Sequence, residues 1–164
     1  MDTMSVYITV YSEDLEDGET GAWFTLPFDY DKVEEILGID IQYENYTVQG
    51  DELPFDIDDD ITVEELNDRY NMYEELPDYI KDNLDEIIGY FDTFEGLYDF
   101  HEYIICYSGC ESIAALVREY SDTERFGEIP VHLKDFIDYE AYIKTIDIAS
   151  DFIETNNGVI EIPY

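Results

Sequence analysis

Hydrophobic and polar residues alternate at the start of the chain, with apolar side chains at every second position from Val6 to Val10. Alternation with a period of two is typical of a β-strand that buries one face. This pattern predicts a strand over residues 4–11. The segments 21–28 and 43–49 predict two further strands, so the chain is expected to begin with a small sheet.

A short helix is expected between the second and third of these strands. Asp29 is suited to cap its N-terminus, and Gly38 lies just past its last residue, Leu37. Val33, Ile36 and Leu37 would share one face of this helix.

The pattern changes to a helical period in the middle of the chain. Thr62 and Glu65 form a capping box for a helix that is expected to end near Glu75. Apolar residues then recur every three or four positions over residues 80–91, and Thr93 is expected to cap another short helix. The middle of the chain is therefore predicted to be helical.

The last third mixes both patterns. The apolar run 103–108 predicts a strand, and residues 111–120 predict a helix. Asp138 is expected to cap a further helix over residues 139–146. Residues 151–164 predict a hairpin, with Asn157-Gly158 as its turn.

These elements predict an α+β fold without a Pro- or Ser-rich linker and without an internal repeat. We expect three small domains in contact. They are an N-terminal α+β domain at residues 1–61, a helical domain at 62–103 and a C-terminal α+β domain at 104–164.

Composition adds an extreme charge to this picture. The 164 residues contain 43 Asp and Glu against seven Lys and Arg, a formal net charge of -36. A disordered acidic tail is excluded because 45% of residues are hydrophobic and 16% are aromatic, enough to build a core. The charge falls along the chain, from -17 over residues 1–60 to -11 over 61–103 and -8 over 104–164.

Such a charge destabilises a compact chain by self-repulsion, so we expect it to serve a basic partner. Duplex DNA carries two phosphate charges per base pair, and 36 charges therefore correspond to roughly 18 base pairs. The numbers permit a mimic of DNA. A halophile-type acidic protein with an unrelated basic partner is the alternative.

Residues 56–66 hold the densest acid, with six carboxylates and no cation. On a helix that begins near Thr62, Val63 and Leu66 would face the core while Glu64 and Glu65 point outward. We expect a rigid, phosphate-like patch here that continues along the helical middle. Its predicted members are Asp56, Asp58, Asp59, Asp60, Glu64, Glu65, Asp68, Glu74, Glu75, Asp78, Asp82, Asp85, Glu86 and Asp92.

The same stretch resembles a calcium loop only in composition. Asp56, Asp58 and Asp60 fit the first ligand positions, but Ile61 replaces the glycine of the sharp turn and Asn67 replaces the final bidentate Glu. We predict no bound metal and no cofactor. A metal-binding protein or metal-dependent enzyme that uses these aspartates remains an alternative.

Other catalytic chemistry finds little support. His101 and His132 lie in no Ser/His/Asp or Cys/His arrangement. Cys106 and Cys110 lack a second Cys or His pair for zinc and are expected to be unpaired thiols of a cytoplasmic protein. No apolar run reaches 18 residues, so no transmembrane segment is predicted. We expect no enzymatic activity.

Two segments together resemble the ArdA antirestriction family. They are GAWFTLP at residues 21–27, which contains Trp23, and FIDYEAY at residues 136–142. The second carries the D-Y-E-x-Y signature as Asp138, Tyr139, Glu140 and Tyr142. Family members often continue it with Gly-Arg-Asp, where this chain has Ile143-Lys144-Thr145.

The resemblance implies a DNA mimic that occupies the DNA-binding groove of type I restriction-modification enzymes and protects incoming mobile DNA. It also implies three small domains in an elongated chain and a homodimer formed through the C-terminal domain. Binding to nucleic acid or to a membrane is not expected. The candidate dimer contacts are Tyr107, Cys110, Phe136 and Tyr139, which could equally fill the core of their own domain.

Overall fold

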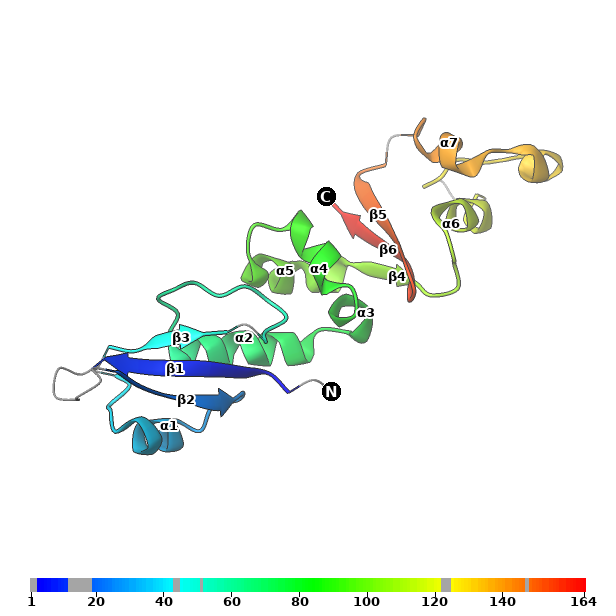
Figure 1. Cartoon of the computed structure of the whole chain (residues 1–164). Coiled ribbons are helices and arrows are strands. Elements are labelled where there is room, and N and C mark those ends of the chain that lie inside the picture. Colours follow the sequence, from blue (N-terminus) through cyan, green and yellow to red (C-terminus); the bar gives the residue numbers. More distant parts are fainter. Residues whose placement is uncertain (1–2, 12–18, 43–44, 51, 122–124, 147) are drawn as a thin grey trace. The chain divides into compact units, whose positions relative to one another are not determined.

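The computed structural model describes residues 3–11, 19–42, 45–50, 52–121, 125–146 and 148–164, and its fold is α+β (Figure 1). The chain divides into two compact units between Tyr98 and Asp99. We call residues 1–98 unit 1 and residues 99–164 unit 2. The division into three domains stays a prediction.

Unit 1 begins with the predicted sheet. Its strands are β1 (Ser5–Tyr11), β2 (Glu19–Thr25) and β3 (Thr47–Gln49), which pair antiparallel in the order β2-β1-β3. The first two predictions are confirmed, although the second strand ends before Pro27. The third strand is shorter than predicted, and residues 43 and 44 lie outside the described residues.

Helix α1 (Tyr30–Leu37) confirms the predicted caps. The side chain of Asp29 accepts a hydrogen bond from the backbone of Lys32, and Gly38 is the C-cap. Val33 and Leu37 are buried, but Ile36 is 59% exposed. The buried stripe of this eight-residue helix is narrow, and Ile36 lies at its edge.

The helical middle consists of several short helices. They are α2 (Val63–Glu75), α3 (Asp78–Lys81), α4 (Leu84–Ile87), the 3₁₀ turn η1 (Ile88–Tyr90) and α5 (Phe94–Phe100). Asn83 interrupts the helical pattern of residues 80–91. Its backbone leaves the helical conformation, and its side-chain amide donates to the carbonyl of Tyr79 at 2.7 Å.

Helix α2 is attached to the N-terminal part of unit 1 by a buried side chain. Asn67 accepts a hydrogen bond from the backbone N–H of Phe28 at 2.7 Å, and its amide reaches the Tyr30 hydroxyl at 3.0 Å. Val63 and Leu66 of the same helix are buried. These hydrogen bonds therefore attach α2 to the segment that leads from β2 into α1.

Unit 2 contains a second antiparallel sheet, in the order β4-β6-β5. Its elements are η2 (His101–Tyr103), β4 (Ile105–Tyr107), α6 (Ile113–Glu119), η3 (Val131–Phe136), α7 (Tyr139–Ile143), β5 (Ser150–Thr155) and β6 (Gly158–Pro163). The helix expected over residues 139–146 is thus shorter than predicted. The core of the unit gathers around Leu116, Val117, Phe126 and Val159.

The terminal hairpin is confirmed, but its turn is displaced by one residue. Thr155 pairs with Gly158, so Asn156 and Asn157 form the two-residue loop. Gly158 is the first residue of β6 and has a φ of 122°, a conformation that L side chains rarely adopt.

Candidate functional site

All fourteen carboxylates of the predicted acidic patch are exposed. We call this set the acidic surface; it comprises Asp56, Asp58, Asp59, Asp60, Glu64, Glu65, Asp68, Glu74, Glu75, Asp78, Asp82, Asp85, Glu86 and Asp92. They lie on the loop before α2 and along α2 to α4, with Asp92 just before α5. Every member belongs to unit 1, whose 98 residues contain 29 Asp and Glu against three Lys and Arg.

The start of α2 holds its carboxylates as predicted. Val63 and Leu66 are buried, with 1% and 0% of their surface exposed, while Glu64 and Glu65 are exposed. Thr62 caps the helix by accepting from the N–H of Glu65 at 3.1 Å. The acidic side chains are therefore carried by a helix that is anchored in the core.

Glu65 takes part in this cap as well as in the acidic surface. Its Oε2 accepts hydrogen bonds from the Thr62 backbone N–H at 2.9 Å and from the Thr62 hydroxyl at 2.8 Å. The backbone hydrogen bond is the larger of the causes that lower the pKa of Glu65 below its ordinary value, followed by the hydroxyl bond. The carboxylate is held in one orientation and in its charged form.

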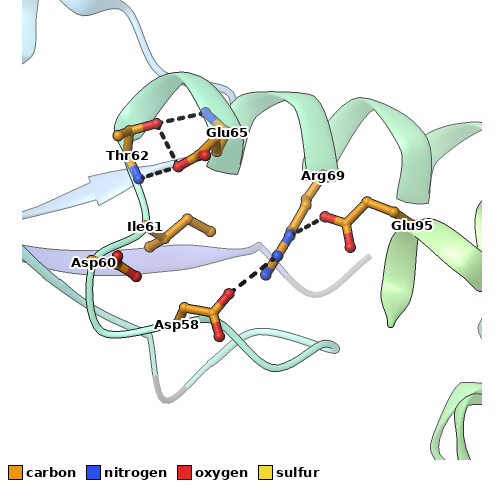
Figure 2. A pocket seen from close by; sticks show the side chains of 7 residues that line it. All are labelled: Asp58, Asp60, Ile61, Thr62, Glu65, Arg69 and Glu95. Carbon is orange, nitrogen blue, oxygen red and sulfur yellow. Dashed lines mark hydrogen bonds and ion pairs between the residues drawn. The ribbon is translucent and has the colours of Figure 1, made fainter. Parts of the chain in front are cut away.

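Arg69 contacts the acidic loop, which we define as residues 56–60. The sequence did not indicate this contact (Figure 2). Its guanidinium donates through Nε to Glu95 at 2.6 Å and through Nη1 to the backbone carbonyl of Asp56 at 3.0 Å. Nη2 lies 3.6 Å from the carboxylate of Asp58. A stretch that has no cation of its own therefore receives one from α2.

An open pocket surrounds this arginine in unit 1 (Figure 2). It is lined by Asp58, Asp60, Ile61, Thr62, Glu65, Arg69 and Glu95. Ile61 is buried, and its N–H donates to the carbonyl of Asp58 at 3.1 Å. Phe55 fixes the other end of the loop, because its ring packs on Phe94 with centroids 4.8 Å apart.

The other two cations of unit 1 also contact the chain's own groups. Lys81 donates to the carbonyl of Glu74 at 2.9 Å, and its ammonium lies 5.2 Å from the ring centroid of Tyr73. Lys32 lies 3.5 Å from Asp29. The cations of this unit thus serve internal contacts, while the acidic surface faces outward.

Trp23 belongs to an aromatic pair on the outer face of the first sheet. It is 58% exposed, and its ring centroid lies 5.5 Å from that of Tyr7 on the neighbouring strand. The ring of Tyr7 in turn covers Gly21, where an added Cβ would lie 2.7 Å from the ring. The spacing G-x-W therefore leaves room for the tyrosine and places the tryptophan beside it.

The D-Y-E-x-Y segment has a structural role in unit 2. Asp138 caps α7 by accepting from the N–H of Ala141 at 3.1 Å. The hydroxyls of Tyr139 and Tyr142 each donate at 2.6 Å, to the carbonyls of Lys134 and Phe126. The two tyrosines thereby tie α7 to the segments before it, while Glu140 is exposed.

The four predicted dimer contacts divide into internal and surface residues. Cys110 and Tyr139 are buried in the core of unit 2, and the hydroxyl of Tyr107 donates to Glu161 at 2.7 Å. Phe136 is 83% exposed. It lies on η3 with Val131 and Leu133, which are 80% and 42% exposed, so η3 presents an apolar surface.

The two cysteines are free, and their environment disfavours the reactive thiolate. Burial and, secondarily, a hydrogen bond to Glu119 raise the pKa of Cys110 to about 11. Burial also raises the pKa of Cys106. A nucleophilic cysteine has the opposite shift, because its thiolate is stabilised.

Within the described ranges, no three His, Cys, Asp or Glu side chains converge in a way that could hold a metal ion. Asp58, one of the three aspartates that fit ligand positions of a calcium loop, faces the guanidinium of Arg69 instead. None of the helices in the described part of the chain has the length and apolar character needed to cross a membrane.

Comparison with models of known families finds a match over most of the chain. A family model described as "Antirestriction protein (ArdA)" matches residues 6–161. A search of curated proteins found no significant match. The family match spans both units and includes the two segments that contain Trp23 and Tyr139.

Proposed function

The chain belongs to the ArdA antirestriction family, and from that premise we propose that it inhibits type I restriction-modification enzymes as a mimic of DNA. Members of this family are inhibitor proteins rather than enzymes. In the proposed mechanism, the acidic surface occupies the DNA-binding groove of the target enzyme. Incoming mobile DNA is then neither bound nor cut, and the inhibition takes place in the cytoplasm.

The observation that carries this proposal is the outward presentation of fourteen carboxylates from ordered elements of unit 1. A groove that binds duplex DNA is lined by basic side chains matched to successive phosphates. Carboxylates held on elements with buried apolar residues, such as the capped helix α2, meet such a groove without a large loss of conformational entropy on binding. Little of the free energy of the contacts is then lost to ordering the carboxylates, so the inhibitor can bind tightly enough to compete with DNA.

A homodimer formed through unit 2 would extend this surface. Unit 2 has the smaller charge excess, with 14 Asp and Glu against four Lys and Arg, and η3 exposes Val131, Leu133 and Phe136. Two chains together carry about 72 negative charges, the equivalent of roughly 36 base pairs.

Sedimentation at micromolar concentration should detect the dimer. The substitution Phe136→Ser should shift the equilibrium from the dimer toward the single chain. A single-chain mass at all concentrations contradicts the dimer.

Competition tests the proposal directly. A type I enzyme is bound to a labelled duplex, and the protein is titrated in at several salt concentrations. We expect displacement of the duplex that weakens steeply as salt rises. If no stoichiometry displaces DNA from several type I enzymes at low salt, the proposed function is wrong.

A substitution series tests whether the mimicry is distributed over many charges. Single changes such as Asp59→Asn should alter displacement little, because the field sums many carboxylates. Five changes combined from Asp59, Asp60, Glu64, Asp68 and Asp78 should weaken it strongly. Five matching changes in unit 2 provide the control for lost net charge outside the acidic surface.

The alternatives predict other outcomes. A halophile-type protein would be stabilised by salt but would not displace DNA from the enzyme. A metal-dependent protein would bind calcium or magnesium stoichiometrically in calorimetry, and Asp58→Asn with Asp60→Asn would abolish that binding. Robust retention of duplex DNA by the protein itself would contradict the mimic, which has the charge of DNA.

A further inference from the structure

We propose that Arg69 is a positioning residue that fixes the geometry of the acidic loop, residues 56–60, for the basic groove of the partner. This inference rests on the proposed function and adds a requirement to it. The loop must be held in place by a cation, although a cation opposes the field that attracts the partner.

The contacts of Arg69 join three segments of unit 1. From α2 it reaches Glu95 on α5, the backbone carbonyl of Asp56 and the carboxylate of Asp58. The guanidinium can do this because its donors form a planar fork, which the single ammonium of a lysine lacks. The loop is therefore attached at its middle as well as at its ends, where Phe55 and Ile61 are buried.

The burial of the three charged groups differs in a way that suits this role. The side chain of Arg69 is 16% exposed, whereas those of Asp58 and Glu95 are 78% and 41% exposed. The guanidinium lies between the carboxylates of Asp58 and Glu95 (Figure 2). An approaching groove would meet the anions first, and the positive charge would remain largely covered.

Substitution of Arg69 distinguishes a positioning role from a purely electrostatic one, because the two roles predict changes in binding of opposite sign. The variant Arg69→Met is one charge more negative, so its attraction to a basic groove should increase if charge alone decides binding. If Arg69 positions the loop, binding should weaken because the loop must then be ordered at the cost of conformational entropy. Lys32→Met is the matched control, since it removes an exposed cation of the same unit.

We expect Arg69→Met to displace DNA roughly three- to ten-fold less well than the natural protein, the loss of a preorganised loop. Lys32→Met should displace it as well or slightly better. Arg69→Lys should fall between the natural protein and Arg69→Met. Equal or tighter binding by Arg69→Met than by Lys32→Met overturns the proposal.

Hydrogen exchange tests the positioning without the enzyme. The N–H of Ile61, which donates to the carbonyl of Asp58, should exchange roughly tenfold faster in Arg69→Met and by a smaller factor in Arg69→Lys, because the loop opens locally. The amides of the β1–β2 pair, in the same unit, should be unchanged, which excludes unfolding of unit 1. If Arg69→Met does not fold, Arg69→Lys supplies the comparison, since it keeps the charge and loses the fork.

The two readouts separate the proposals. If the natural protein displaces no DNA, the DNA mimic is wrong, while faster exchange at Ile61 still supports Arg69 as the residue that orders the loop. Unchanged exchange in both Arg69 variants overturns the positioning role, whatever the displacement.

Discussion

Gly158 is the residue at which unit 2 tolerates a side chain least. A Cβ there would lie 2.3 Å from the carbonyl oxygen of Tyr107, and the φ of 122° is strained for any L side chain. Both the overlap and the strain act on the central strand of the sheet. Neither was visible in the sequence, where this glycine was expected within the turn.

We predict that Gly158→Ala destabilises the protein by about 3 kcal/mol or more, from steric overlap and backbone strain together. Thermal or urea unfolding measures the change. Gly109→Ala is the control from the same unit, because a Cβ there meets nothing within 4 Å. A loss of stability no larger than that of the control would contradict the geometry of the β4–β6 contact.

The raised pKa of Cys110 gives a second prediction at this scale. With an ordinary value of 9.0 and a folded value of about 11, the folded protein has a roughly hundredfold smaller thiolate fraction at pH 8. In a Cys106→Ala background, a thiol reagent should therefore label Cys110 far more slowly in the folded than in the urea-unfolded chain. Similar rates in both states would mean that the thiol is not buried.

The same shift has a consequence for stability. The pKa is raised on folding, so the protonated thiol contributes stability below pH 9.0, and this is lost as the pH rises toward about 11. In the Cys110→Ala variant the unfolding free energy should have a smaller pH dependence over that range.

Glu161 illustrates what a residue pattern cannot indicate. It is completely buried in β6, where it forms an ion pair with Arg125 and accepts from Tyr107 and from Ser150, the latter at 2.6 Å. In a chain with 43 acidic residues, no local signal distinguishes this Glu from the exposed ones. Its burial is stable because three partners from distant segments satisfy it.

At the scale of elements, helix starts were predicted well because their signals are local. Asp29, Thr62 and Asp138 each cap a helix whose first N–H groups lie within three residues. Arg69 could not be paired from sequence in the same way. Its partner Glu95 is 26 residues away, and only the packing of α2 with α5 brings the two together.

The capping box of α2 gives a prediction for an element. Thr62→Ala should lower the unfolding free energy by about 1 kcal/mol, because the N–H of Glu65 loses the Thr62 hydroxyl that accepts its hydrogen bond. Urea unfolding measures this loss. Thr62→Ser keeps the hydroxyl and should remain close to the natural protein. Equal losses in both variants would show that the methyl group of Thr62, rather than the cap, stabilises α2.

At the scale of the whole molecule, salt should act on folding and on binding with opposite signs. From about 0.1 M to 1 M salt the Debye length shortens from about 10 to about 3 Å, which screens the mutual repulsion of the carboxylates. The melting temperature should therefore rise with salt, while displacement of DNA falls. The variant with five carboxylates of the acidic surface replaced should show smaller salt-dependent changes in melting temperature and in displacement of DNA. A melting temperature that falls with salt would mean that the net charge does not limit stability.

The position of Trp23 beside Tyr7 in the first sheet has a consequence for fluorescence measurements. Trp23 is the only tryptophan of the chain and lies in unit 1. Excitation at the red edge of the indole absorption band excites Trp23 in the first sheet. Its emission maximum and its quenching therefore report on unit 1 alone. Far-ultraviolet dichroism averages both units. If the two signals change at different urea concentrations, the units unfold separately, and each free energy is then accessible from one uncut, unlabelled chain.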